Sequence, residues 1–262
     1  MMLVNSSLFW LVLGAHLLGD FYFQNEKLAR EKNDGSFYAL ATHSCYYAAT
    51  MLLITLCFYG GSALLLGVAL SVIHFLIDWV KMRISSQKVT LCSLKRSTPP
   101  TRKKQRSPRC LFFCDQLVHL ITITLATVTF LSFVDTSHSP LTLWLQCLYE
   151  NRLQVTLPPD KFVQSVVILL LLIRPVNIAI RMLGSKTGND LGMGRYIGIL
   201  ERLIVLILAL YGQYSAIAFV FAAKSIARFK KIENEPAFAE YYLMGTLFSA
   251  LTAILGAIVI NL

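Results

Sequence analysis

The chain has 262 residues, of which 56% are hydrophobic and 15% are charged, and its formal net charge is +10. Its mean hydropathy is +0.61. This composition excludes an ordinary soluble enzyme and predicts an all-α, polytopic transmembrane helical bundle.

Long apolar runs predict about eight transmembrane helices. The first run has no basic leader and no cleavage site, so we interpret it as a retained helix and not as a signal peptide. The run Tyr196–Phe229 fits either one long tilted helix or two helices with a turn near Gly212. The other runs, in chain order with the first, are 3–23, 38–59, 62–83, 111–134, 163–183 and 238–260.

The placement of Lys and Arg favours the two-helix alternative. With eight crossings, nearly all Lys and Arg of the connecting loops lie on one side, whereas the opposite loops carry only Arg152 and Lys161. Basic loops face the cytoplasm. Both termini are therefore expected on the outer, periplasmic side of a bacterial inner membrane.

Three regions are expected along the chain. Residues 1–134 form an N-terminal half with four crossings, 135–162 an outer loop with an interfacial segment, and 163–262 a C-terminal half. The segment 84–109 is strongly basic, and we interpret it as a cytoplasmic loop in preference to a nucleic-acid contact. Attraction to anionic lipid and recruitment of a cytosolic partner are secondary possibilities for this loop.

Three apolar runs each carry a histidine and an aspartate four residues apart. Residues at this spacing share one face of a helix. Ionisable groups in membrane segments are costly and usually mark functional sites. The predicted topology places all of these groups, with one further histidine, at a similar depth near the cytoplasmic face, where they would form a metal site or a proton relay. The seven residues are His16, Asp20, His43, His74, Asp78, Asp115 and His119.

Seven such ligands exceed the needs of one tetrahedral zinc ion and suit two metal ions about 3.5–4 Å apart. Zinc is the first expectation, with manganese or iron as alternatives. Gln24 and Gln116 are expected to orient the ligands by hydrogen bonds. Lys81 either joins them or extends to the membrane interface.

The second half has its own group of charges. A structural ion-pair network is one interpretation, and a pocket in which surplus cations hold a phosphate is the other. Glu201 is expected to pair with Lys224 or Arg228. The full group is Arg195, Glu201, Arg202, Lys224, Arg228 and Glu240.

Several motifs together resemble an uncharacterised family of bacterial inner-membrane proteins, domain of unknown function 3307. They are GAHLLGDFYFQ, HSCYY, HFLIDWVK and FFCDQLVH in the first half, and GRYIGILERLIVLILALYGQYSAIAFVFAAKSIARF and AEYYLMGTL in the second. The resemblance implies a membrane protein and brings no activity. The His/Asp pattern is also loosely similar to membrane-bound metal-dependent hydrolases.

We therefore expect a membrane metalloprotein that hydrolyses a lipid-linked or phosphorylated substrate at the cytoplasmic face. A proton- or ion-coupled transporter that uses the His/Asp groups is the first alternative. A non-catalytic membrane scaffold or sensor is the second.

Overall fold

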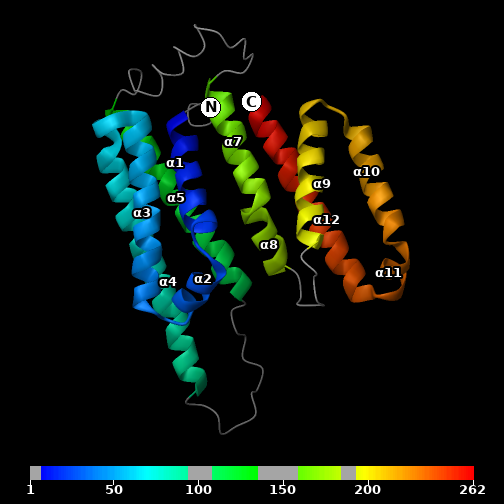
Figure 1. The fold of residues 1–262 in the computed structure, drawn as a ribbon, viewed down its shortest axis with the longest axis horizontal. Helices are drawn as coiled ribbons and strands as arrows, with labels where there is room; N and C mark the ends of the chain where they lie inside the picture. Colours follow the sequence, from blue (N-terminus) through cyan, green and yellow to red (C-terminus); the bar gives the residue numbers. More distant parts are fainter. Residues whose placement is uncertain (1–6, 94–107, 135–158, 184–192) are drawn as a thin grey trace. The chain divides into compact units, whose positions relative to one another are not determined.

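The computed structural model describes residues 7–93, 108–134, 159–183 and 193–262, and all the elements in these ranges are helices (Figure 1). The chain divides into two compact units, Met1–Val163 and Gln164–Leu262. Three expectations fall on residues outside the described ranges: the outer loop with its interfacial segment, most of the basic segment, and the connection before residue 193.

Unit 1 contains four long helical stretches, which are α1 (Ser7–Leu17) continued by the π-helix η1 (Leu18–Tyr22), α3 (Phe37–Tyr59), α4 (Leu64–Ser93) and α5 (Pro108–Phe133). The short helix α2 (Glu26–Asn33) connects η1 to α3, and the 3-10 turn η2 (Gly60–Ala63) connects α3 to α4. Each of the short connections has a local cause. Asn25 caps α2 by accepting a hydrogen bond from Leu28 N at 2.7 Å. Gly60 ends α3 with φ of 68°, a conformation that favours glycine.

α4 extends ten residues beyond its expected end at 83, into the segment predicted as a basic loop. The expectation of a loop from residue 84 was wrong because nothing stops the helix there. The first helix-breaking residue after Gly67 is Pro99.

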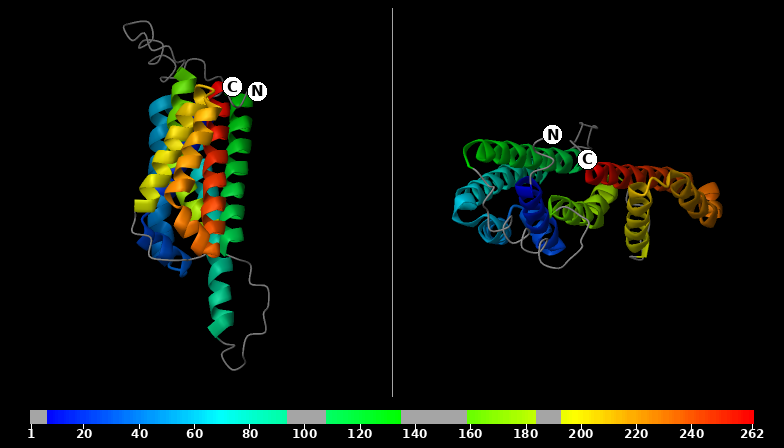
Figure 2. Two further views of the ribbon diagram at one scale, coloured as in Figure 1. Left: turned by 90° about the vertical axis from the view of Figure 1, so that its right-hand side faces the viewer. Right: turned by 90° about the horizontal axis from the view of Figure 1, so that it is seen from above.

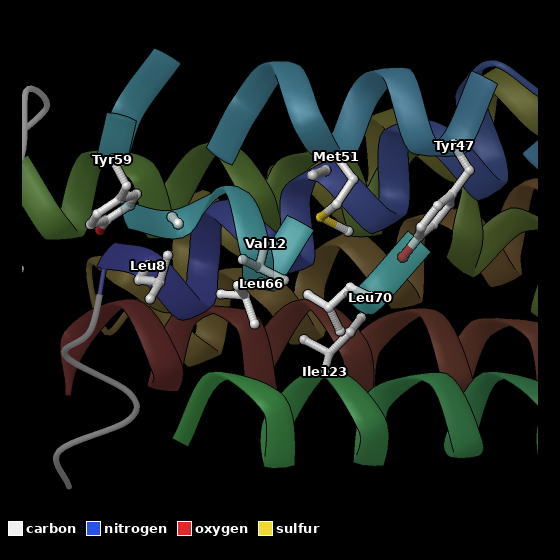
Figure 3. Close-up of a cluster of buried hydrophobic side chains, with 10 residues drawn as sticks. Leu8, Val12, Tyr47, Met51, Tyr59, Leu66, Leu70 and Ile123 are labelled. Atoms are coloured by element: carbon white, nitrogen blue, oxygen red, sulfur yellow. The ribbon is translucent and has the colours of Figure 1, made fainter. Parts of the chain in front are cut away.

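The core of unit 1 is built from one face of each long helix. Figure 3 shows the buried apolar side chains of these faces pointing toward one another, with Tyr59 at one end of the cluster and Tyr47 at the other. All are buried. The labelled residues are Leu8 and Val12 from α1, Tyr47, Met51 and Tyr59 from α3, Leu66 and Leu70 from α4, and Ile123 from α5.

Unit 2 contains the last residues of α7 (Pro159–Ile173), then α8 (Pro175–Leu183), α9 (Met193–Leu210), α10 (Tyr214–Ala227), α11 (Phe229–Asn234) and α12 (Pro236–Asn261). α12 packs against α8 and α9, and α10 packs against α9 (Figure 2). Gly212, with φ of 67°, forms the turn between α9 and α10. The turn expected near this glycine is confirmed.

Four stretches of the described residues are long and apolar enough to cross a membrane: Phe37–Ile84, Cys110–Phe133, Asp160–Leu183 and Pro236–Asn261. The expected eight crossings are therefore not supported. The first stretch contains two helices, α3 and α4, and the apolar helices Ser7–Tyr22 and Tyr214–Ala227 are shorter than the roughly 20 residues a crossing needs. α9 is long enough, but Arg195, Glu201 and Arg202 lie within its 18 residues.

Candidate metal centre

The seven His and Asp side chains singled out in the sequence lie together inside unit 1. They come from five elements, and none is more than 9% exposed. α1 and η1 contribute His16 and Asp20, α3 contributes His43, α4 contributes His74 and Asp78, and α5 contributes Asp115 and His119.

Helical spacing positions two of the pairs as expected. His74 Nε2 lies 3.4 Å from Asp78 Oδ2 on α4, and His119 Nε2 lies 3.7 Å from Asp115 Oδ1 on α5. The pair on the first helix differs, because Asp20 lies in the π-helix η1. Such π-turns are rare and are frequent at functional sites, since the wider turn redirects the side chains that follow.

The π-turn packs tightly on α3. A Cβ atom on Gly19 would lie 2.9 Å from Tyr47 Cδ2 and 3.2 Å from Tyr47 Cα. Only glycine lets the two backbones come this close. The contact therefore holds Asp20 against α3, the helix that carries His43.

One set of ligand atoms has the dimensions of a tetrahedral metal site. His43 Nε2 lies 3.3 Å from Asp20 Oδ1, 3.2 Å from Asp78 Oδ2 and 3.2 Å from His74 Nε2. His74 Nε2 completes the set at 3.4 Å from Asp78 Oδ2. Zinc binds N and O ligands at about 2.0–2.1 Å in a tetrahedron, whose edges are then roughly 3.3–3.4 Å. Four of the six edges match this length.

Two further sets overlap with the first. The ligand atoms of Asp78, Asp115 and His119 lie within 4.8 Å of one another, as do those of His16, His74 and His119. Asp78 thus belongs to two sets and is placed to bridge them. Asp115 Oδ1 and His119 Nε2 are buried without a hydrogen-bond partner. Such atoms are rare in folded proteins and fit ligand positions.

Two lysines neutralise part of the negative charge. Lys32 Nζ donates to Asp78 Oδ2 at 2.8 Å, and Lys81 Nζ donates to Asp115 Oδ2 at 2.5 Å. Lys32 is 5% exposed, whereas the side chain of Lys81 is 20% exposed. If all four imidazoles are neutral, as metal ligands must be, the three carboxylates and two ammonium groups leave one excess negative charge, which a cation would balance.

The sequence did not single out Lys32. It lies on α2, in a polar segment that is typical of a solvated loop, and only the packing of α2 against α3 and α4 turns it inward. A weak signal was available, because Asn25 and Glu26 predict a helix start seven residues before Lys32.

Both expected glutamines contact the cluster. Gln116 Nε2 donates to Asp20 Oδ2 at 3.0 Å and to Asp115 Oδ2 at 3.3 Å. With its amide oxygen turned toward the cluster, Gln24 accepts from Lys32 Nζ at 3.1 Å. These contacts fix the carboxylates and the ammonium group, rather than the imidazole rings.

Tyr47 orients two of the imidazoles and was also missed. Its hydroxyl lies 3.2 Å from His16 Nδ1, and its ring stacks on His74 with the centroids 3.6 Å apart and 3° between the planes. Tyr47 follows His43 by four residues on α3, so helical spacing was the signal that could have found it.

The charges of unit 2 form two separate contacts. Lys224 Nζ donates to Glu201 Oε2 at 2.5 Å and to Thr246 Oγ1 at 3.1 Å, so the expected pairing of Glu201 with a lysine is present. Arg202 instead donates to Asn177 Oδ1 at 2.5 Å.

The three remaining members of the expected group lie nearer the surface. The Arg195 guanidinium lies over the exposed Tyr196 ring, 5.1 Å from its centroid. Arg228 is partly exposed and Glu240 is exposed. Among the described residues, neither of these two joins the Glu201 or Arg202 contacts.

A family model described as "Protein of unknown function (DUF3307)" matches residues 8–146. The matched segment includes all seven His and Asp residues of the buried cluster. No curated protein and no solved structure matches the chain.

Proposed function

Since the chain belongs to the DUF3307 family of proteins of unknown function, we propose a function from its own side chains. In this proposal, unit 1 is embedded in a membrane and holds a metal centre, at which a phosphorylated, lipid-linked substrate is hydrolysed. The observation that carries this proposal is the set of four N and O atoms from Asp20, His43, His74 and Asp78, in which four of the six separations match the edges of a zinc tetrahedron.

The donor set favours zinc, with manganese or iron as alternatives, because it combines imidazole nitrogens with carboxylate oxygens and includes no thiolate. Asp78 belongs to two ligand sets, so it would serve both sets if the site held two metal ions. A metal ion at such a site supplies a hydroxide near neutral pH and stabilises the negative charge that develops on a phosphoryl oxygen.

The protein's own residues would do the rest. Lys81 is the most exposed of the cluster's charged side chains, so we assign it the anionic group of the incoming substrate. Gln116 holds Asp20 and Asp115, and Tyr47 holds His16 and His74. These bonds limit the rotation of the ligands and keep them in place for binding.

The outer surface of unit 1 supports a membrane substrate. Exposed apolar side chains follow helical spacing along α4 at Leu65, Val68, Val72 and Leu76. α3 has 23 residues and α4 has 30, enough for each to span a hydrocarbon core of about 30 Å. We propose that the two helices cross separately, as part of about eight crossings in a bacterial inner membrane. The His/Asp cluster would then lie near the cytoplasmic face and both termini in the periplasm.

The first test is the metal content of the full-length protein purified in detergent, measured by elemental mass spectrometry. Wild type is expected to carry zinc, manganese or iron, and Asp78→Asn and Asp20→Asn are expected to lose most of it. Asp34→Asn is the matched control, because Asp34 is an exposed carboxylate of the same unit that lies outside the cluster. Equal metal content in all four proteins would refute the metal centre.

A second measurement tests the reaction. Metal-loaded protein in nanodiscs is expected to release phosphate from a lipid-linked phosphoester, and Lys81→Met is expected to raise KM more than it lowers kcat. A well-folded wild type that takes up no metal after supplementation would instead favour the transporter alternative. In that case, a pH-dependent flux in proteoliposomes should be lost in Asp78→Asn.

A further inference from the structure

Arg202 is the largest fully buried side chain that the structure describes. It lies in the middle of α9 in unit 2 and is 1% exposed. Its Nη2 donates to Asn177 Oδ1 at 2.5 Å, and its Nε is buried without a hydrogen-bond partner. A guanidinium has five N–H donors, and the buried Nε–H of Arg202 is left for another acceptor.

The charges around Arg202 do not balance. The adjacent carboxylate, Glu201, is bound by Lys224 at 2.5 Å. The other carboxylates that the structure describes in unit 2 are exposed, and they are Glu233, Glu235 and Glu240. These contacts therefore hold two cations, Arg202 and Lys224, and one anion, Glu201. A buried charge without a partner costs several kcal/mol, as a general rule, so an additional anion is expected beside Arg202.

A glycine on the same helix lies beside the guanidinium. Long side chains on a helix turn back toward its N-terminus. Arg202 therefore lies over Gly198, one turn earlier on α9. A Cβ atom on Gly198 would lie 4.0 Å from both terminal nitrogens of Arg202 and 4.0 Å from Asn177 Oδ1. Because residue 198 has no side chain, α9 places no side-chain atom of that residue against this flank of the guanidinium.

Asn177 fixes the direction of the guanidinium. Its amide nitrogen donates to Ile173 O at 2.7 Å, which leaves its oxygen for Arg202. An amide oxygen brings no negative charge, so it orients Arg202 without neutralising it. The guanidinium of Arg202 is therefore a planar set of donors in a fixed orientation, and Asn177 does not neutralise its charge.

We propose that Arg202 binds a phosphate-type oxyanion within unit 2, with Asn177 as the residue that positions it. The guanidinium matches two oxygens of a phosphate, and the charge of the anion would complete the balance with Lys224 and Glu201. A lipid headgroup and free inorganic phosphate offer the same chemistry. This site uses no residue of the His/Asp cluster, so it stands or falls independently of the metal centre.

The test measures both probes on full-length, delipidated protein in detergent. Equilibrium dialysis with labelled inorganic phosphate tests the free anion. Native mass spectrometry after incubation with phosphatidylglycerol, beside phosphatidylcholine, tests the headgroup. Arg202→Gln should weaken binding of the preferred probe at least tenfold, because it removes the charge and the fork. Arg195→Gln is the matched control on the same helix, since Arg195 is exposed, and it should bind as wild type does.

Asn177→Asp gives a second, nearly isosteric variant. The new carboxylate would lie within hydrogen-bond distance of Arg202 and supply the anion from the chain itself. It should abolish binding while raising the temperature of unfolding. The proposal would be overturned if wild type bound neither probe. Wild-type affinity in Asn177→Asp, or in a folded Arg202→Gln, would overturn it as well.

Discussion

Replacing Tyr47 by phenylalanine removes one oxygen from the edge of the proposed metal centre. The hydroxyl contact to His16 Nδ1, at 3.2 Å, is lost, whereas the ring that stacks on His74 remains. Metal affinity is expected to fall about 10–100-fold, because this is the usual effect of losing a group that orients a ligating histidine. The fall corresponds to about 1.4–2.8 kcal/mol. The direct loss of stability should be smaller, about 0.5–1.5 kcal/mol for one hydrogen bond.

Tyr59→Phe is the control for this change. Tyr59 lies on the same helix and is 4% exposed, against 2% for Tyr47. Its hydroxyl lies 2.9 Å from Ser7 Oγ, at the opposite end of the core from Tyr47 (Figure 3). It should cost similar stability and leave metal affinity unchanged.

Zinc affinity is measured by competition with a chromophoric chelator in detergent, and stability by thermal unfolding of the same samples. The reasoning is refuted if Tyr47→Phe binds zinc as wild type does. It is equally refuted if both variants lose the same affinity, since the effect would then be one of general stability.

Three further results are expected from unfolding measurements. Lys32→Met should lower the free energy of unfolding by about 3–5 kcal/mol, because it leaves the buried carboxylate of Asp78 without its ammonium partner. The control Lys27→Met, at an exposed ion pair, should change it by no more than about 0.5 kcal/mol. Equal effects of the two substitutions would contradict the buried pair. Gly67→Ala should lower the free energy of unfolding by about 1–3 kcal/mol, because its Cβ would lie 2.6 Å from Thr55 Oγ1. Gly61→Ala is the control, because its Cβ would have no atom within 4 Å, so it measures the effect of the backbone alone. Removing the metal with a chelator should lower stability by about 2.7 kcal/mol relative to protein with free metal at 100 times its Kd, and an unchanged unfolding temperature would argue against a bound metal.

Most of what the sequence predicted about the site came from the four-residue spacing of His and Asp along single helices. The pairs His74/Asp78 and Asp115/His119 follow from the helical repeat, and the charge bias of the loops brought them to one depth with His16 and His43. The convergence of all seven side chains is what the structure adds to that expectation.

Contacts between helices explain what the sequence did not predict. Lys32 lies in a segment with the composition of a loop, and its burial depends on how α2 packs on α3 and α4. The π-turn at Asp20 packs with Gly19 against Tyr47 of α3, and the sequence around Asp20 does not predict this contact. Eight crossings are not supported by helix length and composition, because the hydropathy of the sequence does not show where an apolar helix is shortened, as α10 is by the turn at Gly212.

The distribution of the cluster over five elements sets an order for its assembly. The helices of a nascent chain leave the ribosome one after another, and α1 and η1 emerge with His16 and Asp20 more than ninety residues before α5 supplies Asp115 and His119. If the helices insert in a membrane as proposed, each one would until then carry ionisable groups whose partners have not been synthesised. Translation must therefore pass His119 before the complete set of ligands exists. A chain truncated after α4 would retain three of the four long helical stretches of unit 1 but would lack Asp115 and His119.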